Sequence, residues 1–567
     1  MNRSLFTRSG KRNAIASLIA TIIALHGVLI VAAPLVYISV SSRDVHFHPV
    51  RLIFDVQLLF AVTLLYLSTL LRRRKQRAWT VTMVVYGLLI VTAVLRAALV
   101  HRQAWGSMIE TLARGDIAIP VLVVVGLWLS RNQFTVKSDT RSFMVSLQVA
   151  ALALGVTFLY GVTGFMILGQ HSREFHHHIT LAEAAHRTVD QLNITTSTNL
   201  EPRSRRADVF VDSLTFLSVT AVAYCFISLF QPVRSRLSHQ KADRRLAQAL
   251  IDDFPVDSES FFKLWPRDKQ YFFNDTQTAG VAYGVRRSVA VVVGDPFGDP
   301  AEFPMLLDRF EAFCRDNDWA PAFVHTTLAN ADLFRDHGYA LQKLGEEAVV
   351  DVPKFYEHVR QTKYFRQIKS RFEKRGYTVE VSQLPHSKET LQRVAAISEQ
   401  WLARPGRDER RFMLGYFNAV YMQQCPLLLL RDADGIVQAF LNQLPVIDPQ
   451  EANFDLLRGG AEAPSNSNDF LLLAFIDMLH EQGVQKLNLG LCPLAGLTEQ
   501  PHNKQNVLIT SALKFVFANG DRFYSFRGLY KFKAKYEPEW RPRYVAYKGG
   551  VAGFTKTMTA LNKLMSL

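Results

Sequence analysis

"FDLLRGGAEAPSNSNDFLLLAFIDML", residues 454–479, decides how the second part of this chain folds. A strand-like run delivers Asp455 and Arg458 into a loop of small polar residues, and an apolar helical pattern begins after Asp469. Two strand residues three positions apart point to opposite faces, so we expect the strand to end or to bulge at Gly459 and Gly460, which would bring both charges to one site. A strand, a polar loop and a helix in this order predict an α/β domain with its site at the loop.

The same order of elements occurs twice in the second part of the chain. Strand-like runs flank the helical run "FPMLLDRFEAFCRDND" (303–318), and strand-like runs flank "NDFLLLAFIDMLHEQG" (468–483), with "DRFYSF" (521–526) as the last expected strand. We therefore predict two α/β halves of similar layout, at 245–380 and 381–567.

The first 240 residues have a different character, because their apolar runs approach the length of about 20 residues that crosses a bilayer. Loops on the side of the N-terminus hold 17 Lys and Arg, against 9 on the other side, which places both chain ends in the cytoplasm. We predict an N-terminal α-helical transmembrane domain at 1–240 with about six spans: Ala14–Val40, Leu52–Leu71, Trp79–Val100, Ile117–Leu129, Phe143–Leu168 and Val209–Phe230.

A basic helix is expected between the two halves, at about 354–375. Seven basic residues between 360 and 375 face one acid, Glu373, so pairing along the helix cannot neutralise them. A solvated charged face is the simpler interpretation, but the excess charge favours contact with RNA phosphates or anionic lipid headgroups. The residues on this face are Arg360, Lys363, Arg371, Lys374 and Arg375.

Seven motifs, in order, make the region from about Phe261 to Tyr547 resemble the phosphatidylglycerol lysyltransferases, the multiple peptide resistance factor family. They are "VVVGDPFGD" (291–299), "KLGEEAVVDVPKF" (343–355), "ISEQWL" (397–402), "RFMLGYFN" (411–418), "FDLLRGG" (454–460), "LNLGLCPLAGL" (487–497) and "FRGLYKFKAKYEPEWRPRYVAY" (526–547).

The resemblance implies a fold and an activity. The fold is a cytoplasmic tandem of two acetyltransferase-like (GNAT) halves joined by a basic helix. The activity is transfer of an amino acid, with lysine and alanine foremost, from aminoacyl-tRNA to the glycerol hydroxyl of phosphatidylglycerol, which lowers the negative charge of the membrane and gives resistance to cationic peptides. The implied partners are aminoacyl-tRNA, phosphatidylglycerol and the cell membrane, with an oligomer left open.

The loop of the opening stretch departs from two patterns. An acetyl-CoA enzyme needs glycine where Ala461 stands, and Glu462 beside it is unfavourable for a pyrophosphate. Asn466 replaces a glycine of the family, but asparagine tolerates the same left-handed backbone. We therefore expect the turn to form and to bind something other than coenzyme A.

The charged residues can be given roles in an ester exchange. This reaction needs the two substrates held close together, a base near the attacking hydroxyl group, and a cation near the negative charge that develops on the ester oxygen. We predict Asp455, Arg458 and Lys533 as catalytic: Asp455 orients the attacking hydroxyl or the substrate ammonium, Arg458 holds a phosphate, and Lys533 contacts a phosphate or the oxyanion. Lys535 and Arg543 are predicted to contact a phosphate or the oxyanion. Glu346 and Glu347 are predicted to bind the ammonium group of the amino acid or to be structural. Asp469 is predicted to bind substrate or, alternatively, to cap the helix.

Two further classes of function stay open at this point. One is a tRNA-dependent transferase for peptidoglycan precursors, and the other is a lipid translocator with a degenerate cytoplasmic domain that does not act as an enzyme. The aminoacyl ester is already activated, so no cofactor and no metal is expected. The four scattered cysteines have no metal-binding spacing and fit a reducing compartment.

Overall fold

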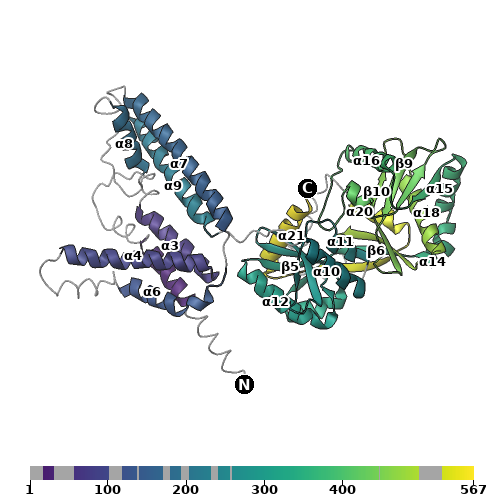
Figure 1. Cartoon of the computed structure of the whole chain (residues 1–567), viewed down its shortest axis with the longest axis horizontal. Helices are drawn as coiled ribbons and strands as arrows, with labels where there is room; N and C mark the ends of the chain where they lie inside the picture. The colour runs from purple at the N-terminus through teal and green to yellow at the C-terminus, as the bar shows by residue number, and fades with distance from the viewer. Residues whose placement is uncertain are drawn as a thin grey trace, which may run out of the picture. The chain divides into compact units, whose positions relative to one another are not determined.

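The computed structural model describes residues 17–30, 56–100, 118–136, 140–169, 179–192, 204–230, 240–255, 258–445, 447–496 and 526–566. The chain divides into two compact units, with the boundary between Arg234 and Ser235 (Figure 1). The first unit is helical, and the second is a mixed α/β structure. The strand expected at 521–526 lies mostly outside the described residues.

Apolar helices lie at all six positions at which spans are predicted. Three stretches are long and apolar enough to cross a membrane among the residues described, Gln76–Val94, Leu147–Leu168 and Arg205–Ser228, and the other three apolar helices are shorter. The count of six spans therefore stays a prediction. The helices of this unit are Ser17–Ile30, α3 (Val56–Arg72), α4 (Gln76–Val100), α6 (Ala118–Leu129), α7 (Thr140–Gly169), α8 (Leu181–Leu192) and α9 (Arg205–Ser228).

Helices α7 and α9 approach each other closely because α7 carries glycine at the contact. A Cβ atom at Gly164 would lie 2.1 Å from the ring of Phe210, so no larger residue fits there without a shift. Phe165 completes the contact edge to face with Phe210, with ring centroids 5.0 Å apart. Small residues at such contacts are typical of helices that pack in a membrane.

The second unit is built on one continuous sheet. Its strand order is β1-β2-β3-β5-β12-β6-β11-β10-β9-β8-β7, with β4 paired to β2. The strands are β1 (Gln270–Phe273), β2 (Ala279–Arg286), β3 (Val289–Val293), β4 (Phe297–Gly298), β5 (Ala320–Thr326), β6 (Ala340–Asp351), β7 (Thr378–Ser382), β8 (Leu427–Arg431), β9 (Val437–Gln443), β10 (Glu451–Gly459), β11 (Lys486–Pro493) and β12 (Glu539–Tyr547).

Each half follows the predicted acetyltransferase-like pattern. An antiparallel series leads into a parallel pair joined by a helix: β3 and β5 around α12 in the first half, and β10 and β11 around α18 in the second. The main helices of this unit are α10 (Gln240–Asp253), α11 (Phe261–Leu264), α12 (Phe303–Asp316), α13 (Ala331–Asp336), α14 (Val352–Glu357), α15 (Lys363–Lys374), α16 (Lys388–Leu402), α17 (Ala419–Met422), α18 (Ser467–Glu481), α20 (Phe526–Ala534) and α21 (Gly550–Met565).

The two halves share their strands instead of standing side by side. The last strand of the chain, β12, runs antiparallel between β5 and β6 of the first half, and β6 in turn pairs with β11 of the second half. The C-terminal α21 packs its buried Phe554, Met558 and Leu561 into the core of the first half, with Val291 and Val324. Neither half is therefore complete without residues from the other.

One detail of the predicted secondary structure is wrong, and a second is more precise in the structure. The helix expected at 354–375 is divided into α14, a short 3-10 turn at Val359–Gln361 and α15, because Thr362 has an extended backbone with φ −65° and ψ 155°. For the opening stretch, β10 ends at Gly459, as one of the two predicted alternatives has it, and the bulge lies earlier, between Phe454 and Leu457.

We expect Val545→Asp to destabilise both halves, because Val545 is fully buried on β12. An unpaired buried carboxylate should lower the free energy of unfolding by more than about 3 kcal/mol. Hydrogen exchange followed by mass spectrometry should accelerate in β5 and also in β11, while Lys556→Asp on the exposed face of α21 should change little. Faster exchange confined to the first half would contradict the shared sheet.

Candidate functional site

Both parallel strand pairs place an aspartate where the pairing ends. In the first half, Asp295 comes two residues after β3. In the second half, β10 pairs with β11 through Glu451–Asn453, and Asp455 comes two residues later. Ligands of open α/β sheets bind in the crevice at the carboxyl ends of parallel strands. These two positions are therefore the first places to look for a site.

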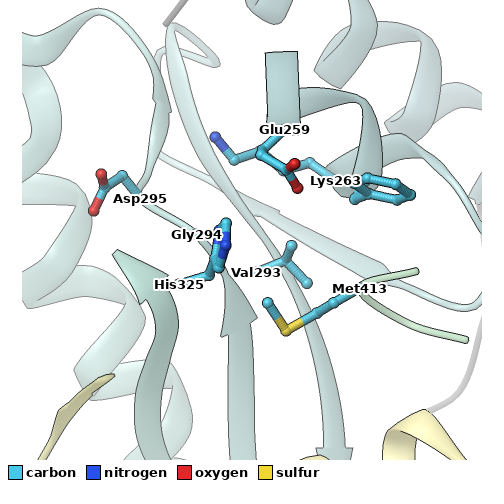
Figure 2. Close-up of a pocket in the computed structure, with 8 residues that line it drawn as sticks. Glu259, Lys263, Val293, Gly294, Asp295, His325 and Met413 are labelled. Atoms are coloured by element: carbon cyan, nitrogen blue, oxygen red, sulfur yellow. The ribbon is translucent and has the colours of Figure 1, made fainter. Parts of the chain in front are cut away.

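The crevice of the first half is nearly closed. Asp295 Oδ2 accepts hydrogen bonds from the backbone amide of Thr327, at 3.1 Å, and from its hydroxyl, at 2.7 Å, which ties the ends of β3 and β5 together. A pocket of about 20 Å³ remains, with Glu259, Lys263, His325 and Met413 gathered around it (Figure 2). That volume holds about one water molecule, so this crevice has no room for a substrate in the described conformation.

In the second half, Asp455 lies between neutral hydrogen-bond donors. The Tyr421 hydroxyl donates to Asp455 Oδ2 at 2.8 Å, and the backbone amide of Gly415 also hydrogen-bonds to the carboxylate. Burial raises the pKa of the Asp455 carboxyl group to about 6, and these hydrogen bonds and the charge of Arg458 offset only part of the effect. A carboxyl group with this pKa exchanges its proton near neutral pH, as a general base must.

Gly415 and Tyr421 fix the position of this carboxylate. A Cβ atom at Gly415 would lie 1.8 Å from Asp455 Oδ2 and 2.6 Å from the Tyr421 ring, so only glycine allows the chain to pass there. The Tyr421 ring is fully buried and stacks on Trp265, with centroids 5.0 Å apart and planes at 19°. The stacked rings therefore hold the Tyr421 hydroxyl group, and with it the Asp455 carboxylate, in one position.

Arg458 lies beside Asp455 but is already fully engaged. Its guanidinium group pairs with both oxygens of Glu409, at 2.8 and 3.0 Å, donates to Ser398, and lies 4.6 Å from the centroid of the Trp401 ring. Only 4% of the residue surface is exposed. A phosphate contact by Arg458, as predicted, would require it to exchange these bonds.

A cluster of buried charges lies at the seam between the halves. Glu347 is 0% exposed and pairs with Arg543 at 2.5 Å and with His325 Nε2 at 3.0 Å. Burial alone would raise the pKa of Glu347, but the charges of His325 and Arg543 hold it at about 2. For His325, burial opposes protonation, and Glu347 outweighs it and raises the pKa of the imidazole. Glu347 and Arg543 thus neutralise each other.

Three side chains of this cluster have the geometry to hold a metal ion. The ligand atoms of Glu259, His325 and Glu347 lie within 4.8 Å of one another. However, the cation of Arg543 already occupies one oxygen of Glu347, and Lys263 lines the same pocket. Two neighbouring positive charges disfavour a metal cation, so we assign the three groups to a buried ion-pair network.

Lys533 lies close to the point where β10 and β11 separate. Its ammonium group donates to the backbone oxygens of Gly490, at 2.8 Å, and Leu491, at 3.0 Å, and the residue is 6% exposed. Burial lowers the pKa of the Lys533 ammonium group, and the nearby carboxylates Glu259 and Glu347 partly offset this effect. The lysine therefore fixes β11 and brings a positive charge into the centre of the unit.

The start of α18 is held by a second network. Asn466 is the N-cap residue in the left-handed conformation, with φ 73°, so the expected turn forms without glycine. Asp469 does not cap the helix, which corrects that alternative. It lies in the first turn, almost fully buried, and accepts hydrogen bonds from Lys535, from Tyr536 at 2.9 Å and from Tyr364 at 3.1 Å.

The basic residues of the joining segment fall into two groups. Arg360 is engaged with both oxygens of Asp477, at 2.6 and 2.8 Å, and does not belong to the free charged face. Lys363, Arg371 and Lys374 line an open groove of about 540 Å³ on α15. Arg371 also donates to Ser465 and Asn466 at 3.0 Å, which joins this groove to the loop before α18, while Arg375 is exposed at the end of the helix.

The structure thus separates the predicted residues into three places. Asp455 and Arg458 lie together. Glu347, Arg543 and Lys533 lie in the central cluster, beside which Glu346 pairs with Lys343 at 2.6 Å. Asp469, Lys535 and the α15 residues form the third place.

Sequence reasoning missed several residues around these places: Glu259, Lys263, Asp295, His325, Glu409, Gly415 and Tyr421. Gly415 lies in a motif that had been recognised, "RFMLGYFN", and Asp295 lies in "VVVGDPFGD". For the others, nothing in the sequence connects them to Asp455 or Glu347 before the strands are paired.

The fold and these sites define the class: a protein with a membrane region and a tandem acetyltransferase-like unit whose halves share one sheet. Residues 248–547 match the family model described as phosphatidylglycerol lysyltransferase, C-terminal. The chain belongs to this family. Residues 11–198 match the model described as the transmembrane region of lysyl-tRNA synthetase.

Individual relatives agree with the family match. A phosphatidylglycerol lysyltransferase of Bacillus subtilis (strain 168) is 30% identical over 351 residues, which are 60% of this chain and 40% of the relative. One of Staphylococcus aureus (strain MRSA252) is 28% identical over 330 residues, 58% of this chain and 38% of the relative. The chain thus spans less than half the length of these relatives.

Two solved structures are similar to the second unit. The L-PGS of Bacillus licheniformis is 29% identical with a TM-score of 0.51, and covers 57% of this chain and 96% of its own. The C-terminal domain of a putative lysylphosphatidylglycerol synthetase from Agrobacterium fabrum is 31% identical with a TM-score of 0.50, and covers 58% and 98%.

Glu347 and its neighbour Glu346 offer a matched test of the buried cluster. Glu347→Gln should lower the free energy of unfolding by about 3–5 kcal/mol, because it leaves Arg543 buried without its counter-charge. Glu346→Gln should cost less, because Glu346 is partly exposed and Lys343 keeps its hydrogen bond to the backbone oxygen of Gly496. Denaturant titration of both variants checks this difference, and equal losses would contradict the central role of Glu347.

Proposed function

We propose that this chain transfers an amino acid from aminoacyl-tRNA to the glycerol hydroxyl of phosphatidylglycerol. The observation that carries the proposal is Asp455, a carboxyl group with a pKa of about 6 at the end of the parallel pair β10 and β11. The family and the names of the relatives supply the substrate class. The reaction would lower the negative charge of the membrane and protect the cell from cationic peptides.

The proposed chemistry is ester exchange. Asp455 accepts the proton of the lipid hydroxyl while the hydroxyl oxygen attacks the carbonyl carbon that joins the amino acid to the tRNA. The carbon–oxygen bond to the ribose breaks as the new ester forms, and the proton passes to the ribose oxygen. Tyr421 and Gly415 hold the carboxylate in place during these steps. The ester is already activated, so the reaction needs positioning and charge stabilisation and no further group.

The other predicted residues receive supporting roles. We propose that Arg458 positions the loop after β10 through Glu409, in place of the phosphate contact predicted from sequence. Lys533 stabilises the developing negative charge from the central cluster. Lys535 and Asp469 shape the start of α18, and Glu347 and Arg543 hold the halves together.

The open groove on α15 is the proposed site for tRNA phosphates. Lys363, Arg371 and Lys374 line it, and exposed Arg375 extends it. Phosphate contacts dominate the binding of nucleic acids to such surfaces. The second unit must therefore face the compartment that holds tRNA, in accord with the cytoplasmic orientation predicted from the Lys and Arg count.

Lysine is the proposed amino acid, and alanine is the alternative. The relatives are named lysyltransferases, and the membrane region matches a model named for lysyl-tRNA synthetase. Lipid mass spectrometry decides between them, because the two esters differ in mass.

Cells that express the chain should contain aminoacylated phosphatidylglycerol, and Asp455→Asn should nearly abolish it. The change keeps the shape but removes the base, which is worth about 10²- to 10⁴-fold in rate. The wild-type rate should rise with pH through about 6, as the Asp455 carboxyl group loses its proton.

Asp408→Asn is the control, since Asp408 is an exposed carboxylate in the neighbouring loop. If the expressed wild type produces no aminoacylated lipid, the proposed function fails. If Asp455→Asn retains activity within a few-fold, the function stands but Asp455 is not the base.

Replacing Arg371, Lys374 and Arg375 together with Ala should weaken tRNA binding and flatten its salt dependence. The slope of log K against log salt should fall by about one for each lost phosphate contact. The matched control replaces the exposed Lys486, Lys556 and Lys563, which removes the same charge elsewhere. Equal slopes for the two triple variants would mean that the basic residues of α15 form a solvated charged face and do not bind tRNA.

A further inference from the structure

One arginine of the α15 groove is fastened to the loop that precedes α18. The Nη2 atom of Arg371 donates to the backbone oxygen of Ser465 and to Oδ1 of Asn466, both at 3.0 Å. Arg371 is also exposed and lines the groove, so one side chain belongs to both places. Because both bonds leave from Nη2, the Nη1 atom of the guanidinium group remains for a ligand in the groove.

The side chain of Asn466 is oriented by a buried network. Its Nδ2 atom donates to the Tyr364 hydroxyl at 3.1 Å and to Asp469 Oδ2 at 3.3 Å, which leaves Oδ1 as the acceptor for Arg371. Asp469 is 4% exposed and accepts a hydrogen bond at 2.9 Å from the fully buried Tyr536. The interior of the second half thus fixes the amide of Asn466, and the amide fixes the arginine at the surface.

The backbone at Asn466 allows the role of this side chain to be separated from that of the turn. Asn466 has φ 73°, in the left-handed region that glycine enters without strain. Glycine at this position would keep the conformation of the turn and remove the amide that bonds to Arg371. The bond from Arg371 to the backbone oxygen of Ser465 does not depend on that amide.

The lining of the groove suits a chain of phosphates. Among the described residues, the side chains that line it include no acid and are Lys363, Arg366, Gln367, Ser370, Arg371 and Lys374. The row from 363 to 374 extends over about 16 Å of helix, at 1.5 Å per residue. A lipid headgroup brings its phosphate to one point of such a row, whereas the backbone of RNA carries a phosphate at every nucleotide.

We propose that Asn466 is a positioning residue that holds Arg371 ready for a phosphate group of tRNA. A free arginine side chain has many rotamers, and ordering it at the moment of binding costs free energy. Asn466 and Ser465 remove part of this cost, because the guanidinium group is already held at the groove before the ligand arrives. Asn466 acts through Arg371. The inference rests on the proposed function, which makes tRNA the ligand of the groove.

Asn466→Gly should weaken the binding of uncharged tRNA to the full chain by about 3- to 10-fold, because Arg371 then has to be ordered on binding. The variant removes no charge, so the slope of log K against log salt should keep its wild-type value. Arg371→Ala should instead lower that slope by about one, because a phosphate contact is lost. The fluorescence anisotropy of labelled tRNA, titrated with the full chain in a neutral detergent, measures both quantities.

Two further variants isolate the contact between Asn466 and Arg371. The double variant Asn466→Gly, Arg371→Ala should bind tRNA no more weakly than Arg371→Ala alone. Gln277→Gly is the matched control, because Gln277 is exposed and also has a left-handed backbone, with φ 57°, in the turn between β1 and β2. It should leave the affinity for tRNA unchanged.

Wild-type affinity in Asn466→Gly would overturn the proposal. An equal loss in the Arg371→Ala background would also overturn it, because the amide would then act through the turn. Mixed micelles with phosphatidylglycerol test the other source of phosphate, and an effect of Asn466→Gly on their binding but not on that of tRNA would overturn the assignment to tRNA. The titration requires no transfer, so a chain that makes no aminoacylated lipid can still pass it. Lipid synthesis combined with unchanged tRNA affinity in Asn466→Gly would overturn this inference alone.

Discussion

The ion pair between Glu347 and Arg543 is the interaction on which the rest of the second unit depends. Glu347 lies on β6 and Arg543 on β12, and both are buried where β12 enters the sheet. Burying either charge alone costs several kcal/mol, so strand β12 and strand β6 must meet in one register. That register places the last strand of the chain inside the first half and leaves β6 to pair with β11. One charge pair thus links the folding of the two halves.

The shared sheet has a consequence for the site. Both halves present an aspartate at the end of a parallel pair, but the two crevices differ. Asp295 is tied to Thr327, which closes the first crevice, whereas Asp455 accepts hydrogen bonds from the hydroxyl of Tyr421 and the amide of Gly415. The core of the first half is completed by the C-terminal helix, and the second half holds the carboxyl group on which the proposed function rests.

Local patterns in the sequence predicted most strands and the helices that follow them, but not the partners of the strands. Strand β12 was missed because Pro542 lies within it, and proline argues against an interior strand. Its neighbours β5 and β6 are also about two hundred residues away, and no local signal reports such a contact. The same holds for the site: the period of a strand identified Asp455, but only the fold brings Tyr421 and Gly415 to it.

The contrast between Asp455 and Glu347 shows that neighbouring charges, and not burial alone, decide the pKa of a buried carboxyl group. Both are enclosed, yet the pKa of Asp455 is about 6 and that of Glu347 is about 2. Glu347 faces two cationic groups, which keep it ionised at every physiological pH and make it a fixed charge. Asp455 faces mainly neutral donors, because the nearby cation of Arg458 is already matched by Glu409. Removing the Glu409 carboxylate would leave Arg458 as an unpaired positive charge beside Asp455 and would lower the pKa of Asp455. Under the proposed function, Glu409 therefore preserves the basicity of Asp455, and two carboxylates pushed apart in pKa divide the structural and the proposed chemical task between them.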